Sequence, residues 1–316
     1  MREVIVAPWL YGILGLTAAV NLVWLALSRI DLYLGDALAI AAPIALVGNL
    51  LFITKRLLRN EAAPARWLVL TDALFQGLFF LKLAWLNVRL LNHLTMSTAF
   101  PYVDDVLIAW DRALGFDWPG YFQWVHDRPW AIDLLDLSYT SLSMLAVLAL
   151  IALLAMGQTL RARLFVEAFF VTAVISIAVG CLFPAEAAVI TMAGAMEQYP
   201  NFETAPGVYH IAHMERLRAT DAAILLDPMR LPGLVTIPSF HTAAGIILAA
   251  AFWRTKLAWP VLGYSIVMIA STPIFGGHYF VDLIAGTALA LLVFAALLSQ
   301  PVYAPLRSRS PSWQRA

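Results

Sequence analysis

The sequence PSFH at residues 238–241 and the sequence STPIFGGHYFVD at residues 271–282 decide how the rest of the chain is interpreted. Each carries a histidine at the start of an apolar run, and Asp282 follows His278 by four residues, on one face of a helix that begins at the histidine. A carboxylate bonded to one ring nitrogen leaves the other nitrogen free to act as a nucleophile. We therefore predict that Asp282 orients His278 and that His241 donates a proton to a leaving oxygen.

The composition predicts a membrane protein. The chain has 316 residues, of which 62% are hydrophobic and 13% charged, whereas about 25% of the residues of a soluble domain are charged. Several apolar runs reach the roughly 20 residues of a membrane-spanning helix. The formal net charge is zero, so we expect no nucleic-acid partner. The fold class is therefore all-α, a polytopic bundle of about eight transmembrane helices, at residues 8–28, 37–58, 66–92, 131–156, 163–183, 236–253, 257–274 and 278–299.

The distribution of positive charge predicts the orientation of these helices. Eight spans put twelve cations on one face, which the positive-inside rule assigns to the cytoplasm. They are Arg2, Lys55, Arg56, Arg59, Arg66, Arg161, Arg163, Arg254, Lys256, Arg307, Arg309 and Arg315. Both termini are then cytoplasmic, and the histidines open to the outer face.

The segment 93–130 lies on that outer face and mixes apolar, acidic and aromatic residues. We expect interfacial helices on the outer leaflet, either as an aromatic belt that anchors the fold or as a lip that guides a lipid. The chain divides into two N-terminal transmembrane helices (1–60), a catalytic membrane domain (61–300) and a disordered cytoplasmic tail (301–316).

The predicted span 66–92 carries Lys82 and Arg89, followed by His93. These three residues lie within about 40° of one another around a helix. Charged groups at membrane depth normally face a partner or a polar cavity, so we predict the cationic wall of a pocket. Snorkelling toward the headgroups is the alternative. Ser239 adds a hydroxyl donor at the start of the span 236–253, where the free N–H groups of the helix attract an anion.

Together, these residues resemble the type 2 phosphatidic acid phosphatase superfamily, the lipid phosphate phosphatases. Its signatures are Lys, six residues, Arg-Pro; then Pro-Ser-Gly-His; then Ser-Arg, five residues, His, three residues, Asp. The chain has matching residues in the same order and spacing: Lys82, Arg89, Pro238, Ser239, His241, Ser271, His278 and Asp282. The sequences PSFH, GGHY (276–279), GFDW (115–118) and FPA (183–185) resemble more narrowly the branch of fungal inositol phosphorylceramide synthase and its bacterial relatives.

Three positions depart from the signatures. Leu90 stands in place of the proline, Phe240 in place of the glycine, and Thr272 in place of the arginine of the third signature. The last departure removes a phosphate-binding cation. Arg216 or Arg218 is available to replace it, and we favour Arg218.

The resemblance implies a two-step reaction that needs no metal or other cofactor. His278 forms a phosphohistidine, His241 acts on the leaving and accepting oxygens, and Lys82, Arg89, Ser239 and Arg218 bind the phosphate. Membrane lipids are the donor and the acceptor, and the branch implies transfer of an inositol-phosphate-like headgroup. A phosphatase acting on a phosphatidate- or polyprenyl-phosphate-like lipid is the alternative. A non-catalytic transporter or scaffold is the alternative of another class. The implied location is a bacterial-type inner membrane, with the site on the extracytoplasmic side.

Overall fold

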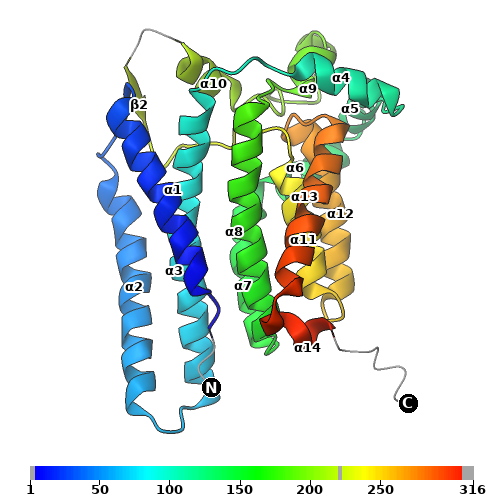
Figure 1. Ribbon diagram of the computed structural model, residues 1–316. Helices are drawn as coiled ribbons and strands as arrows, with labels where there is room; N and C mark the ends of the chain where they lie inside the picture. The colour runs from blue at the N-terminus through cyan, green and yellow to red at the C-terminus, as the bar shows by residue number, and fades with distance from the viewer. Residues whose placement is uncertain (1–3, 220–222, 308–316) are drawn as a thin grey trace, which may run out of the picture.

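The computed structural model describes residues 4–219 and 223–307 as a bundle of helices capped at one end (Figure 1). Within that part of the chain, six helices are long and apolar enough to cross a membrane. They are α1 (Pro8–Leu27), α2 (Ala37–Asn60), α3 (Arg66–Met96), α8 (Thr159–Leu182), α12 (Ala258–Phe275) and α13 (Phe280–Ser299). The prediction of an all-α polytopic membrane bundle is confirmed.

The two remaining predicted spans are irregular. The first is a pair of helices, α6 (Pro129–Thr140) and α7 (Leu142–Ala155), which meet at a 64° bend and count as a seventh span if taken together. The second is α11 (Phe240–Phe252), which has only 13 residues. At 1.5 Å per residue α11 is about 20 Å long, shorter than the roughly 30 Å of a hydrocarbon core. The predicted span 236–253 is longer than the observed helix, because residues 236–239 precede α11, whose N-cap is Ser239.

Helix α8 lies at the centre of the bundle and packs against α3, α7, α11 and α13. The Phe80 ring of α3 meets the Phe170 ring of α8 edge-on, with centroids 5.0 Å apart. Helix α2 lies at the periphery (Figure 1). Only 6% of its apolar 18-residue stretch is buried inside the protein, compared with 61% for α8. Two short strands, β1 (Ile30–Leu32) and β2 (Ile224–Leu226), pair in parallel beside this bundle.

The cap consists of short helices at the upper end of the bundle in Figure 1: α4 (Asp104–Ala113), α5 (Trp118–His126), α9 (Ala188–Met192), η1 (Met196–Gln198) and α10 (Ile211–Arg218). Trp118 and Phe122 of α5 are fully buried and stack on each other, in one core cluster with Tyr279 and Val281. These two aromatic side chains therefore face the protein interior rather than lipid. Their burial attaches the cap to the start of α13.

The opposite end of the bundle holds the α2–α3 and α7–α8 connections together with α14 (Figure 1). Arg161 donates to the Ala251 carbonyl (3.1 Å), and Arg163 pairs with Glu167 (2.8 Å). Part of the predicted disordered tail is helical, because η2 (Pro301–Tyr303) and α14 (Ala304–Arg307) pack on this end with Tyr303 fully buried. Arg2, Arg309, Arg315 and the rest of the tail (308–316) lie outside the described residues.

The contact between α11 and α13 depends on Gly286, because a Cβ atom there would overlap the backbone oxygen of Ser239. We expect Gly286→Ala to push α13 away from residues 238–239 and to lower the free energy of unfolding by about 1–3 kcal/mol. Thermal unfolding in detergent measures this effect. Gly263→Ala on α12 is the control, since a Cβ there meets nothing within 4 Å. Equal melting temperatures for the two variants would contradict this account of the contact.

Candidate active site

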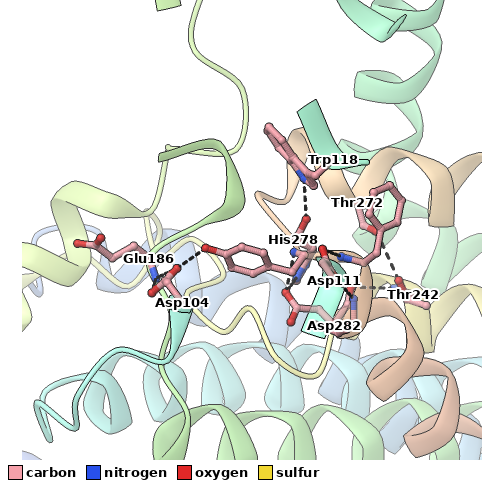
Figure 2. A network of polar contacts seen from close by, with 12 residues as sticks. Asp104, Asp111, Trp118, Glu186, Thr242, Thr272, His278 and Asp282 are labelled. Carbon is pink, nitrogen blue, oxygen red and sulfur yellow. Dashed lines mark hydrogen bonds and ion pairs between the residues drawn. The ribbon is translucent and has the colours of Figure 1, made fainter. Parts of the chain in front are cut away.

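His278 lies just before α13, and Asp282 lies in the first turn of that helix (Figure 2). Helix α13 begins at Phe280 with Tyr279 as its N-cap, so the expectation that His278 opens the helix is wrong. The expected pairing is nevertheless present. The Nδ1 atom of His278 lies 3.2 Å from Oδ2 of Asp282, and both side chains are buried. The same Oδ2 accepts a hydrogen bond from the Tyr279 amide (3.0 Å).

A carboxylate from the cap holds the next two amides of α13. Asp111 of α4 is fully buried and accepts from the Phe280 amide (2.9 Å) and the Val281 amide (2.8 Å) (Figure 2). The indole Nε1 of Trp118 donates to the His278 carbonyl (3.1 Å). The cap thus fixes the backbone on both sides of Tyr279. It also occupies the first N–H groups of α13, which are therefore not free to bind phosphate.

Asp104 of α4 extends this network. Its carboxylate accepts from the Glu186 amide (3.0 and 3.1 Å) and from the Tyr279 hydroxyl (2.7 Å) (Figure 2). Our sequence interpretation missed Asp104, Asp111 and Trp118 as parts of the site. A signal was present, because residues seven apart on a helix lie on one face. Asp104 and Asp111 share their face with Leu107, and carboxylates on an apolar face indicate a buried polar partner.

Two glycines let the chain approach the His278 ring. A Cβ atom on Gly276 would lie 2.6 Å from Cδ2 of His278. Gly277 has φ of +65°, and a Cβ there would lie 2.7 Å from the carbonyl oxygen of Gly207. Glycine adopts such a conformation without steric penalty, so the sequence GGH allows the turn that sets the ring beside the cavity.

A cavity of about 1340 Å³ brings four predicted residues together: Lys82 and Arg89 from α3, His241 from α11, and His278. Both cations lie over the Trp85 ring, with Nζ of Lys82 5.9 Å and Cζ of Arg89 4.5 Å from its centroid. Among the described lining residues they are the only lysine and arginine. Helix α3 therefore gives the cavity two cations, and the carboxylates of Asp133, Asp136 and Glu203 belong to the same lining.

Aromatic stacking holds His241. Its ring lies flat against Tyr139 of α6, with centroids 4.0 Å apart and 16° between the planes. The Tyr139 hydroxyl in turn bonds the Tyr209 hydroxyl (2.7 Å). Since His241 lies in the first turn of α11, this stack fixes the direction of its ring toward the cavity.

Other predicted residues lie away from the cavity surface. Ser239 is fully buried, and its Oγ accepts from the Thr242 amide (3.4 Å) as the N-cap of α11. Arg218 donates to the Phe100 carbonyl (2.5 Å) and lies 4.0 Å from the Tyr102 ring centroid. Neither residue lines the cavity. Thr272 is buried between α12 and α11, where it donates to the Ile269 carbonyl. The structure thus brings no replacement arginine to the cavity from α10.

Comparison with protein families identifies the superfamily of the chain. Residues 105–296, more than half of the chain, match the model of the PAP2 superfamily. The chain belongs to the PAP2 superfamily. Members of the PAP2 superfamily are phosphatases and phosphotransferases, which supports an enzyme rather than a transporter.

The matched region contains His241, His278 and Asp282 but begins after Lys82 and Arg89. These two cations are connected to the histidines because they line the same cavity. No curated protein and no solved structure matches the chain.

Within residues 4–219 and 223–307, no group of three or more His, Cys, Asp or Glu side chains is arranged to hold a metal ion. The PAP2 site instead adds a third buried histidine, His210, which lines the same cavity. The Nε2 atom of His210 lies 2.6 Å from the Glu186 carbonyl. Burial lowers the pKa of His210 to about 4, an effect that the carbonyl opposes and the neighbouring His278 and His213 reinforce.

Asp111 offers a direct test of the cap. Asn at this position keeps one acceptor oxygen and loses both the second acceptor and the negative charge at the start of α13. We expect Asp111→Asn to cut turnover at least tenfold and to lower the free energy of unfolding by about 1–3 kcal/mol. Hydrogen exchange at the Phe280 and Val281 amides should accelerate. Asp105→Asn, at the exposed neighbouring position, is the control, and equal behaviour of the two variants would exclude a special role for Asp111.

The low pKa of His210 predicts acid sensitivity. Between pH 6.5 and pH 4 the unfolded chain binds a proton that the folded chain excludes, so stability falls as the pH is lowered. From pH 7 to pH 5 the wild type should lose about 2 kcal/mol more than His210→Gln, which keeps an N–H donor for Glu186 without titrating. Unfolding in detergent at the two pH values measures the difference. The same pH dependence in both proteins would show that His210 is not the titrating group.

Proposed function

We propose that the protein moves a phospho-headgroup between membrane lipids through a phosphohistidine on His278. The observation that carries this proposal is the buried pair of His278 and Asp282 at the wall of a cavity that also contains His241 and two cations. With Nδ1 bonded to Asp282, the Nε2 atom is the nitrogen left to attack phosphorus. The carboxylate also stabilises the charge that the ring acquires in the attack.

The reaction has two balanced steps. In the first, Nε2 of His278 forms a bond to phosphorus, and the bond from phosphorus to the lipid oxygen breaks as His241 gives that oxygen a proton. In the second, His241 takes the proton of an acceptor hydroxyl, whose oxygen attacks phosphorus and releases His278. Lys82, Arg89 and the N-terminus of α11 stabilise the charge on the phosphoryl oxygens. The proposal requires no metal or other cofactor, and it gives Ser239 the task of capping α11 rather than of binding phosphate.

The cavity is large enough for transfer between two lipids. Pockets for small ligands usually enclose roughly 300–1,000 Å³, and 1340 Å³ leaves room for a donor headgroup together with an acceptor. Resemblance to the inositol phosphorylceramide synthase branch supports an inositol-phosphate-like headgroup. We propose that donor and acceptor are both membrane lipids. Hydrolysis of a phosphatidate- or polyprenyl-phosphate-like lipid is the outcome if water reaches the phosphohistidine first.

The end of the bundle that holds the α2–α3 and α7–α8 connections carries many lysines and arginines, which supports a cytoplasmic position for that end. The cap and the cavity would then lie on the extracytoplasmic side of a bacterial-type inner membrane, with both termini in the cytoplasm. In this orientation the enzyme meets lipids of the outer leaflet of that membrane.

The unequal roles of the two histidines give the test. His278→Ala should form no phosphoenzyme and show no turnover. His241→Ala should still release nitrophenol from a nitrophenyl phosphate ester in a single turnover, because nitrophenol leaves without a proton. The lipid reaction needs that proton and should fall by 10²–10⁴-fold. Mass spectrometry of lipids and trapping of the phosphoenzyme measure both reactions.

A phosphoenzyme on His278→Ala, with neither reaction in His241→Ala, would reverse the assignment of the two histidines. The absence of any phosphoenzyme in the wild type, with every lipid phosphate offered, would reject the proposed chemistry. Lipid products after incubation with hydroxyl-bearing acceptors, compared with free phosphate, separate transfer from hydrolysis.

A further inference from the structure

A second set of polar side chains lines the same cavity and has no part in the reaction described above. Asn92 belongs to α3, Ser176 to α8, and Thr236 to the extended segment before α11. Their exposed fractions are 8%, 1% and 3%. In the described part of the chain, Oδ1 of Asn92, Oγ of Ser176 and Oγ1 of Thr236 have no hydrogen-bond partner. Three elements thus each bring to the lining of one cavity a residue whose polar atom is buried and unsatisfied.

The two helical residues lie at the same level of the bundle. Helices α3 and α8 pack together, and the Cys181 thiol of α8 lies 3.6 Å from the Thr95 carbonyl of α3. Both helices run toward the cap (Figure 1). Asn92 comes about 4.5 Å before Thr95 along α3, and Ser176 about 7.5 Å before Cys181 along α8. Their positions along the bundle therefore differ by only about 3 Å.

Thr236 reaches the same region from the third element. The side chain of its neighbour Val235 packs directly against Gly180 of α8. Leu234 and Leu94 belong to one core cluster, and Val235 and Leu90 pack against it. The segment that carries Thr236 consequently runs alongside α3 and α8 where Asn92 and Ser176 lie.

Buried polar atoms without partners each cost about 1–3 kcal/mol, so a ligand that pairs with them recovers this energy. An amide oxygen only accepts hydrogen bonds, whereas the two hydroxyls both donate and accept. A hydroxyl group of the ligand matches both types, because it too donates and accepts. A trimethylammonium or alkyl group matches neither. Arg89 lies one turn before Asn92 and lines the cavity, so it is available for the phosphate next to such a hydroxyl.

We propose that Asn92, Ser176 and Thr236 form a binding site for the uncharged, hydroxyl-bearing part of a phospholipid headgroup. The inference rests on the proposed function in that it takes the cavity as the site of the phosphodiester. It adds a chemical basis for choosing among headgroups. Lipids with headgroup hydroxyls are selected over lipids of equal charge that lack them.

Binding to the full-length His278→Ala protein tests the site without turnover. The probes are phosphatidylglycerol, which has two headgroup hydroxyls, and phosphatidylethanol, which has the same phosphodiester charge and no hydroxyl. Competition between them in detergent, read by native mass spectrometry, should favour phosphatidylglycerol about tenfold. Asn92→Leu, Ser176→Ala and Thr236→Val should each reduce that preference about twofold, the effect of one weak hydrogen bond between neutral groups.

Two further variants guard against a general loss of structure. Thr236→Ser keeps the hydroxyl and should keep the preference. Ser265→Ala removes another buried hydroxyl without a partner, but one that does not line the cavity, and should also leave the preference unchanged.

Equal binding of the two lipids by His278→Ala would overturn the proposal, as would an unchanged preference in all three site variants. A loss as large in Ser265→Ala as in the site variants would overturn it too. The readout is separate from catalysis. If the wild type forms no phosphoenzyme but the preference is present and depends on these residues, the proposed reaction fails and the binding site stands.

Discussion

Three consecutive amides, from Tyr279 to Val281, donate to two fully buried carboxylates, Asp111 of α4 and Asp282 of α13. The first amides of a helix have no partner within it and carry its positive dipole end, so they attract negative charge. In most helices a single side chain or water meets this need. Here the second carboxylate comes from the cap, 170 residues away in the sequence. The position of His278 depends on this contact, because the histidine directly precedes the amides that the carboxylates hold.

This arrangement determines where a phosphate can bind. An anion at the start of α13 would compete with Asp111 and Asp282 for the same donors, so in the proposed reaction the N-terminus of α13 orients His278 and does not bind the substrate. The positive charge for the phosphate must come from α3 and from the start of α11. Thr272 fits this division of roles. Its side chain lies in the contact between α12 and α11, with its hydroxyl 3.5 Å from that of Thr242, and a longer cationic side chain would not be accommodated there.

The sequence predicted the features that depend on local patterns. Apolar runs identified every long helix, and the spacing of His278 and Asp282 identified the pair, although the helix begins two residues later than expected. Features that depend on tertiary packing were not predictable in this way. Trp118 and Trp124 belong to the same short helix of the cap, yet the Trp118 side chain is fully buried and the Trp124 side chain is exposed. Arg218 likewise lies in a sequence position from which an arginine could bind phosphate, but in the fold its guanidinium contacts the Phe100 carbonyl and the Tyr102 ring.

The bend between α6 and α7 shows how an irregularity of the backbone contributes to the site. A straight helix from residue 129 to residue 155 would pack evenly along its neighbours. The 64° bend falls next to Ser141, whose hydroxyl bonds the Tyr264 hydroxyl of α12 (2.5 Å). Tyr139 is on the last turn of α6, immediately before this break, and its ring stacks on His241. Because α11 is short, its first turn lies inside the bundle, and His241 packs against a neighbour at that depth. The break in α6–α7 provides this neighbour, and the contact between Ser141 and Tyr264 connects it to α12, the helix that leads into His278.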